Sequence, residues 1–198
     1  NFSMEAIEQT WNGTSNANGR CSATISRNGD LVYRMFLDVD GTGKANIGNP
    51  GNCWIKTVTL EIGGQQIDRH SGVWMETWSE LTQPNPGGTT VSVDSWNAGM
   101  ASAATAGGTI FQTMSGTGGV VDVASSTVAN RFNVPLYFWF CRNAGLALPL
   151  IALQYHEVKV ILDHNIGDAW TSPTLKLWAD YIYLDTDERR RFAQVSHE

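Results

Sequence analysis

The chain has 198 residues and a net charge of -6, with only 16% charged residues but 20 glycines and eight tryptophans. One β domain of this length is ordinary, and the composition favours strands and turns over exposed amphipathic helices, which usually carry more Glu and Lys. The negative charge disfavours direct binding to nucleic acid or to a membrane surface, because displacing counterions from phosphates needs clustered Lys and Arg. We predict an all-β protein.

Four segments in the first half of the chain alternate with the period of a strand: 2–11, 21–27, 31–39 and 54–62. The first is expected to be half buried, with Phe2, Met4 and Ala6 on one face. Asn28-Gly29-Asp30 predicts a hairpin between the second and third segments. Gly63-Gly64 predicts a tight hairpin from the fourth segment into residues 65–68, because glycine adopts positive φ without steric cost.

Two stretches between these segments look like binding or modification sites but are interpreted as turns. Residues 12–19 contain the sequon Asn12-Gly13-Thr14, which we take as a turn because no secretory signal is visible. Residues 38–44 (DVDGTGK) suggest a calcium or phosphate loop. However, Asn49 stands where an EF-hand requires Glu, and Val39 stands where a P-loop requires its first Gly. We expect a surface turn at 38–44.

Residues 70–81 form the best helix candidate, because Ser71 can cap the helix and apolar residues recur at helical spacing: Val73, Trp74, Trp78 and Leu81. Glu76 and Glu80 lie one turn apart, and although such a pair can serve acid-base or metal chemistry, we interpret it as a solvated helix face.

Residues 83–119 are rich in Gly, Ser, Thr and Ala and predict a long excursion with one short helix near 94–104. A further strand is predicted at 120–128. A loop of this length inside a compact domain is usually functional or forms a contact between subunits.

The stretch 131–165 contains two apolar runs, 134–141 and 146–155, separated by a polar turn. Each run is about half of what a membrane-spanning helix needs, so we expect no transmembrane segment. The aromatic content of the first run, and Pro149 near the start of the second, predict two adjacent strands at the centre of a β-sandwich.

Residues 174–185 predict a strand with apolar residues on both faces, so both faces are expected to be covered. Asp185 and Glu188 then resemble a capping box at the start of a helix.

The residues that could carry chemistry show no recognisable spacing. Cys21, Cys53 and Cys141 form no CxxC pair and are expected to be free, buried thiols. His156-Glu157 lacks the second His of an HExxH motif, and on a strand the two side chains point to opposite faces. We expect no enzymatic activity, no catalytic or metal-binding residues and no cofactor.

Three blocks of sequence carry a resemblance to a known family: GGQQIDRHSGVWMETWSELT (63–82), PLYFWFCRNAGLALPLIALQYHEVKV (135–160) and YIYLDTDERRRFAQVSHE (181–198). With NFSMEAIEQTW at the start, they resemble the major capsid proteins of nucleocytoplasmic large DNA viruses, which include iridoviruses, phycodnaviruses and mimivirus relatives. The blocks occur in the family's order and span most of the chain. Residues 83–126 match poorly, in a region where the family itself varies.

The resemblance implies a jelly-roll β-sandwich, the first half of a double jelly roll, with one or two short helices in loops. It implies an N-terminal jelly-roll domain over residues 1–185. Residues 186–198 are then the start of a linker or helix towards a second jelly roll that is absent from this chain. The chain begins at Asn1 without Met and stops inside a charged segment, so we expect a fragment of a longer protein.

The resemblance also implies a structural virion protein. Its subunits are expected to form homotrimers that act as pseudo-hexagonal capsomers, and to contact neighbouring capsomers and minor capsid proteins in an icosahedral capsid assembled in the host cytoplasm. Eight tryptophans in a chain with few charges fit this use, because burial of apolar surface drives association.

Two other classes of function stay open. A carbohydrate-binding β-sandwich module is the runner-up, because aromatic rings stack on sugars; the candidate rings are Trp11, Trp54, Trp74, Trp78, Trp96 and Trp170. A β-sandwich glycosidase would use two carboxylates, for which Glu76 and Glu157 are candidates.

Overall fold

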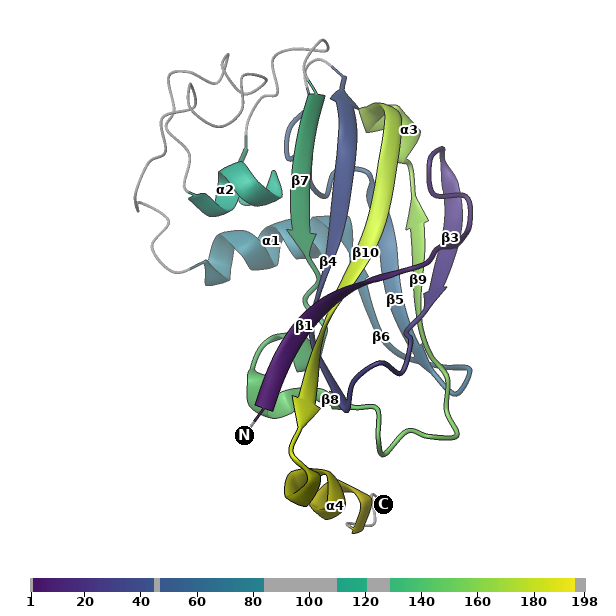
Figure 1. Ribbon diagram of the computed structural model, residues 1–198. Coiled ribbons are helices and arrows are strands. Elements are labelled where there is room, and N and C mark those ends of the chain that lie inside the picture. The colour runs from purple at the N-terminus through teal and green to yellow at the C-terminus, as the bar shows by residue number, and fades with distance from the viewer. Residues whose placement is uncertain (1, 45–46, 84–109, 121–128, 195–198) are drawn as a thin grey trace.

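The computed structural model describes residues 2–44, 47–83, 110–120 and 129–194, and in these ranges two antiparallel sheets pack face to face (Figure 1). The strands are β1 Phe2–Gln9, β2 Asn12–Gly13, β3 Gly19–Thr24, β4 Leu31–Gly43, β5 Ile55–Ile62, β6 Gln65–Ser71, β7 Ala129–Pro135, β8 Leu148–Pro149, β9 Val158–His164 and β10 Trp170–Leu184. The helices are α1 Gly72–Thr82, α2 Ile110–Ser115, α3 Ile166–Ala169 and α4 Thr186–Gln194, with 3-10 turns η3 Trp139–Cys141 and η4 Ala144–Leu146.

The strand order is that of a jelly roll. One sheet runs β1-β10-β4-β7, with β8 pairing to β4, and the other runs β2-β3-β9-β5-β6. When the two-residue strands β2 and β8 are left out, the remaining strands rank 1-8-3-6 in the first sheet and 2-7-4-5 in the second. This alternation between two sheets is the double Greek key of a jelly roll. The all-β jelly-roll prediction is confirmed.

The core lies between the sheets and follows from strand alternation. Met35, Leu37 and Val39 point inward from β4 and are at most 1% exposed. Leu177 of β10, opposite Leu37, is fully buried on the same side. Burying each such side chain contributes about 1.5–3 kcal/mol, so the inward faces of the central strands drive the packing of the sheets.

The predicted hairpin between 21–27 and 31–39 is wrong. β3 pairs with β9 in one sheet, while β4 pairs with β10 in the other, so residues 25–30 cross between the sheets. The Tyr181 hydroxyl holds the crossing by donating to the Ser26 carbonyl at 2.6 Å. The Asn-Gly signal marked the bend correctly, but pairing was decided by strands distant in sequence.

The predicted surface turn at 38–44 is also wrong, because β4 continues as far as Gly43. It is paired on both sides, with β10 and with β7, and these ladders hold it extended. A Cβ at Gly41 would lie 3.1 Å from Pro173 Cα. Glycine therefore permits the close approach of two strands here instead of breaking one.

The prediction that the two apolar runs within 131–165 form two adjacent central strands is wrong. β7 is an edge strand that ends at Pro135, where the ladder loses a donor. The first apolar run then continues through an irregular segment into η3, and the second contains only the two-residue β8 followed by turns. Phe138 and Phe140 are nevertheless fully buried. Only β9, at the end of this stretch, is a central strand.

Several local predictions are confirmed. Gly63 and Gly64, with φ of 59° and 81°, join β5 to β6 in the expected hairpin. α1 begins where predicted, with the Ser71 hydroxyl accepting from the Trp74 backbone N–H at 3.1 Å. β10 and α4 also lie at the predicted places.

The sequence did not show which faces of β1 and α1 are buried. Phe2 is 71% exposed and Met4 48% exposed, because their side of β1 faces away from the core. On α1 the buried positions include Met75 and Ser79, whereas Leu81 is 77% exposed. Apolar periodicity located both elements but did not identify the side that the sheets cover.

Three further expectations concern smaller features. The short helix predicted near 94–104 and the strand predicted at 120–128 fall outside the described residues, except for Val120, which is in no strand. All three cysteines are free, as expected, but only Cys21 is buried, whereas Cys141 is half-buried and Cys53 is exposed. Within the described ranges, no helix has both the length and the apolar character that crossing a membrane requires.

Candidate functional site

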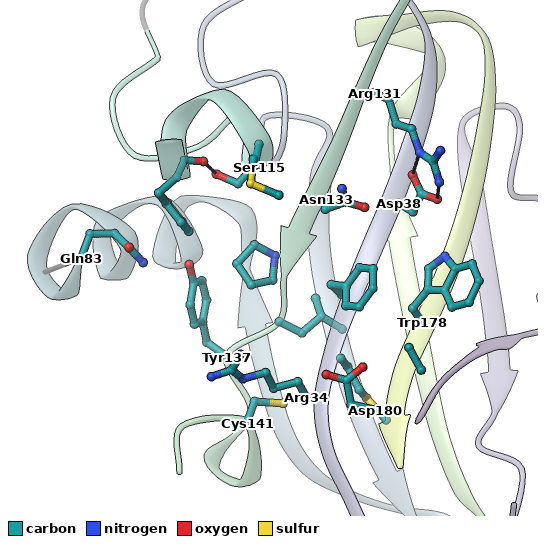
Figure 2. Close-up of a pocket in the computed structure, with 17 residues that line it drawn as sticks. Arg34, Asp38, Gln83, Ser115, Arg131, Asn133, Tyr137, Cys141, Trp178 and Asp180 are labelled. Carbon is teal, nitrogen blue, oxygen red and sulfur yellow. Dashed lines mark hydrogen bonds and ion pairs between the residues drawn. The ribbon is translucent and has the colours of Figure 1, made fainter. Parts of the chain in front are cut away.

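A groove of about 860 Å³ lies on the outer face of the β1-β10-β4-β7 sheet, the face directed away from the second sheet (Figure 2). Its floor is formed by the strands, and α2 and Tyr137 contribute to its wall. Because Met35 and Leu37 point inward from β4, the alternate residues Arg34 and Phe36 point into the groove.

An apolar row crosses the floor of the groove. Trp178 of β10 lies opposite Phe36 of β4, which lies opposite Pro135 of β7. The Phe36 and Trp178 rings stack with centroids 6.3 Å apart and planes inclined by 9°. All three residues are half-buried, so the row keeps part of its apolar surface open to solvent.

A second apolar row crosses the same sheet nearer the chain termini. The strand registers align Met4 of β1, Ile182 of β10, Leu31 of β4 and Pro149 of β8. The outer face of an antiparallel sandwich sheet is usually solvated and polar. Leu31 and Ile182 of this second row are only 8% and 7% exposed, so the open apolar surface comes from the first row and from Met4, and it indicates a contact surface for another molecule or domain.

An ion pair borders the first apolar row. The Arg131 guanidinium donates from Nε and Nη2 to the two carboxylate oxygens of Asp38 at 2.8 and 2.7 Å, as Figure 2 shows. Asp38 is 3% exposed, and the hydrogen bonds to it raise the pKa of Arg131. This bidentate contact clamps β4 to β7 at the groove.

A second carboxylate in the groove, Asp180, is only partly exposed, and its burial raises its pKa while the nearby Arg34 opposes that effect. The groove therefore combines aromatic and aliphatic surface with a few charged groups. This mixture is typical of a protein contact surface.

The wall of the groove is held by contacts that the sequence did not reveal. The Tyr137 hydroxyl lies 2.8 Å from Ser79 Oγ, which joins the segment after β7 to α1. Glu76 accepts from the backbone N–H groups of Gly118 and Gly119 at 2.9 and 2.7 Å. The expectation of a solvated helix face is thus wrong for Glu76, although Glu80 is exposed.

The proposed glycosidase pair receives no support. Glu76 binds the turn after α2, whereas Glu157 accepts from Thr24 Oγ1 at 2.8 Å and lies 3.3 Å from Lys159. Within the described ranges the two carboxylates share no hydrogen-bond partner.

Burial raises the pKa of the Cys21 thiol to about 12, so this thiol is not a ready nucleophile at neutral pH.

Most of the predicted sugar-stacking tryptophans are packing groups. Trp54 and Trp170 are 2% and 1% exposed. Trp74 and Trp78 stack on each other, with centroids 5.4 Å apart. Trp11 is half-buried against the core, and Trp96 lies outside the described residues.

The aromatic surface of the groove comes from Phe36 and Trp178 on its floor and from Phe111 and Tyr137 in its wall. The alternation of β10 was the only sequence signal for Trp178. No group of three or more His, Cys, Asp or Glu side chains in the described part of the chain is arranged to hold a metal ion.

Comparison with known proteins identifies a consistent set of relatives. The family model described as "Major capsid protein N-terminus" matches residues 1–185. The major capsid protein of Pyramimonas orientalis virus is 46% identical over 100% of this chain and 48% of its own length. That of Paramecium bursaria Chlorella virus 1 is 37% identical over 100% of this chain and 44% of its own length.

Solved structures agree with these relatives. The chain matches a subunit of the "PBCV-1 virus capsid, quasi-atomic model" with a TM-score of 0.75 and 35% identity, covering 100% of this chain and 46% of that one. The Faustovirus major capsid protein, at 12% identity, covers 97% of this chain and 56% of its own with a TM-score of 0.61, and supports the fold alone. The chain spans about half the length of the curated relatives that it matches.

Proposed function

Because the chain belongs to the viral major capsid protein family through the N-terminal region of that family, we propose that it is a structural subunit of a capsid shell. It assembles and performs no catalytic turnover. In this proposal residues 1–185 are the N-terminal jelly roll, and residues 186–198 begin a connection to a second jelly roll. The subunits form trimeric, pseudo-hexagonal capsomers of an icosahedral virion, assembled in the host cytoplasm, and contact neighbouring capsomers and minor capsid proteins.

The observation that carries this proposal is the apolar outer face of the β1-β10-β4-β7 sheet. Phe2 and Met4 are 71% and 48% exposed at its edge, and the Trp178–Phe36 stack crosses its centre. Leaving such a surface in water costs about 25 cal/mol per Å² of apolar area. A shell subunit recovers this free energy when another subunit or domain covers the face.

The start of α4 supports the proposed connection. Asp30 accepts from Arg189 through both carboxylate oxygens, at 3.0 Å each, and from the Leu184 backbone N–H at 2.8 Å. This clamp holds the first turn of α4 against the loop before β4, and α4 lies beyond the lower end of the sandwich (Figure 1). A helix anchored in this way gives the chain a defined direction as it leaves the jelly roll.

The test uses the full-length product of the complete reading frame, with wild type compared to Trp178→Ser and Phe36→Ser. Light scattering and electron microscopy measure its assembly. Wild type is expected to form trimers and larger particles, whereas both variants fold but assemble at least tenfold less readily. Tyr155→Ser is the matched control, because Tyr155 is 93% exposed outside the groove. This control should assemble normally.

Two outcomes would contradict different parts of the proposal. Persistent wild-type monomers at high concentration would contradict the capsid function itself. Normal assembly of both groove variants would show that the outer face is not the contact surface.

A further inference from the structure

A column of stacked side chains joins three elements on the side of the sandwich: Phe138, His70, Trp74, Trp78 and Arg142. The His70 ring of β6 lies between Phe138 and Trp74 of α1, with centroids 5.1 and 4.4 Å away. Trp74 stacks in turn on Trp78 at 5.4 Å. The Arg142 guanidinium closes the column 4.6 Å above the Trp78 ring. The column thereby ties both α1 and residues 136–142 to β6.

His70 is the only group in this column whose charge changes near neutral pH. It is 6% exposed, and its Nε2 is buried without a hydrogen-bond partner among the described residues. Its Nδ1 lies 3.7 Å from Asp68 Oδ1, which is too far for a hydrogen bond. The imidazole therefore lies between aromatic rings, and Nε2 makes no hydrogen bond to any described residue, although the backbone of Arg69 and of Tyr137 lies close enough to raise the pKa of the ring.

We propose that this column is an acid-sensitive latch: protonation of His70 releases α1 and residues 136–142 from β6 while the two sheets stay folded. Protonation would leave a charged N–H at Nε2, where the closed column makes no hydrogen bond with any described residue. It would also place a second cation in a column that already ends in Arg142. Opening lets water solvate both nitrogens of the ring.

The surrounding charges agree with a neutral His70 in the closed state. Burial has the largest effect and lowers the pKa of His70. Asp68 and the backbone of Arg69 and Tyr137 raise it, and Arg142 lowers it by a smaller amount. Tyr137, on the same segment as Phe138, is held to Ser79 as a neutral phenol, and burial raises its pKa. Among the described residues, Asp68 is the one carboxylate that lies within ion-pair distance of the ring, and its side chain is 25% exposed to water, which weakens its attraction for a proton on the ring.

The sign of the pH dependence follows from proton linkage. The open state takes up a proton below the ordinary histidine pKa of about 6.5, whereas the closed state takes it up only at lower pH. Above about pH 6.5 the opening equilibrium is therefore independent of this group. Below it, the opening constant rises by up to tenfold per pH unit until the closed state is protonated as well.

The experiment is amide hydrogen exchange of the full-length protein between about pH 4.5 and 8, corrected for the intrinsic exchange rate at each pH. Amides of α1 should lose protection progressively below about pH 6.5, whereas amides of β9 keep theirs. His70→Phe preserves an aromatic ring in the column but cannot titrate, so α1 should stay protected at low pH. Loss of α1 protection in His70→Phe equal to that in wild type would overturn the latch.

A second variant keeps the proposal testable if His70→Phe does not fold. Arg142→Met removes the distal cation, which raises the pKa of His70 in the closed state, so the loss of α1 protection should level off at a higher pH than in wild type. A loss that levels off at the same or a lower pH would contradict the proposal. The latch does not depend on assembly, so its failure would leave the capsid function untouched.

Discussion

Arg131→Met should destabilise the jelly roll substantially, because it leaves the Asp38 carboxylate buried without its counter-ion. The methionine keeps most of the aliphatic stem of Arg131 but removes both hydrogen bonds, which are 2.8 and 2.7 Å long. Asp38 is 3% exposed, and breaking a buried ion pair costs about 3–5 kcal/mol. The Arg131 side chain is 60% exposed, so water can partly replace it. We therefore expect a loss of about 2–4 kcal/mol.

The measurement is urea unfolding at 25 °C, in which the midpoint should fall while the slope stays unchanged. The double variant Asp38→Leu/Arg131→Met should recover to within about 1 kcal/mol of wild type, because it leaves no buried charge. Lys176→Met is the matched control. It breaks the exposed ion pair with Glu8 and should cost at most about 1 kcal/mol. A loss below about 0.5 kcal/mol for Arg131→Met, or no recovery in the double variant, would refute this reasoning.

Three further predictions concern the helix cap, the core and acid stability. Ser71→Ala should lower the free energy of unfolding by about 1 kcal/mol, measured in urea, because the Trp74 N–H loses its cap; Ser71→Asp should retain it. Phe138→Ala should cost about 3–5 kcal/mol in the same assay, since Phe138 is fully buried, and a loss under about 1 kcal/mol would contradict its place in the core. His164 is fully buried, with Nε2 2.9 Å from the Thr14 carbonyl, and burial lowers its pKa. The unfolded chain therefore binds the proton first, so stability should be constant above about pH 6.5 and fall below it. In His164→Gln part of this fall should disappear; an unchanged pH profile would exclude this residue as its source.

Local features of this protein could be predicted because their causes lie within a few residues. Gly63 and Gly64 supply positive φ for the β5–β6 hairpin, and Ser71 caps α1 three residues ahead of the N–H that it accepts from. The alternation in 174–185 likewise located β10. The expectation that its outer face is covered stays a prediction. The resemblance to capsid proteins also rested on sequence blocks, and it predicted the jelly roll that the strand order confirms.

The predictions that were wrong concern features that depend on contacts between segments distant in the sequence. Residues 38–44 look like a turn in isolation, yet two neighbouring strands hold them extended. Glu76 looked solvated because its partners, Gly118 and Gly119, lie more than 40 positions further along the chain. The burial of α1 could not be oriented either, since its periodicity does not tell which side meets the sheet.

By itself, the sequence determined the fold class, the family resemblance and the elements whose signals are local. Only the tertiary structure decided the strand order, the groove and the ion pair between Asp38 and Arg131, which are 93 positions apart. The physical reason is that a jelly roll pairs strands far apart in the chain. Which side chains share its outer face, or join in a stack such as that around His70, is set by the registers and packing of those pairs, which short-range periodicity does not encode.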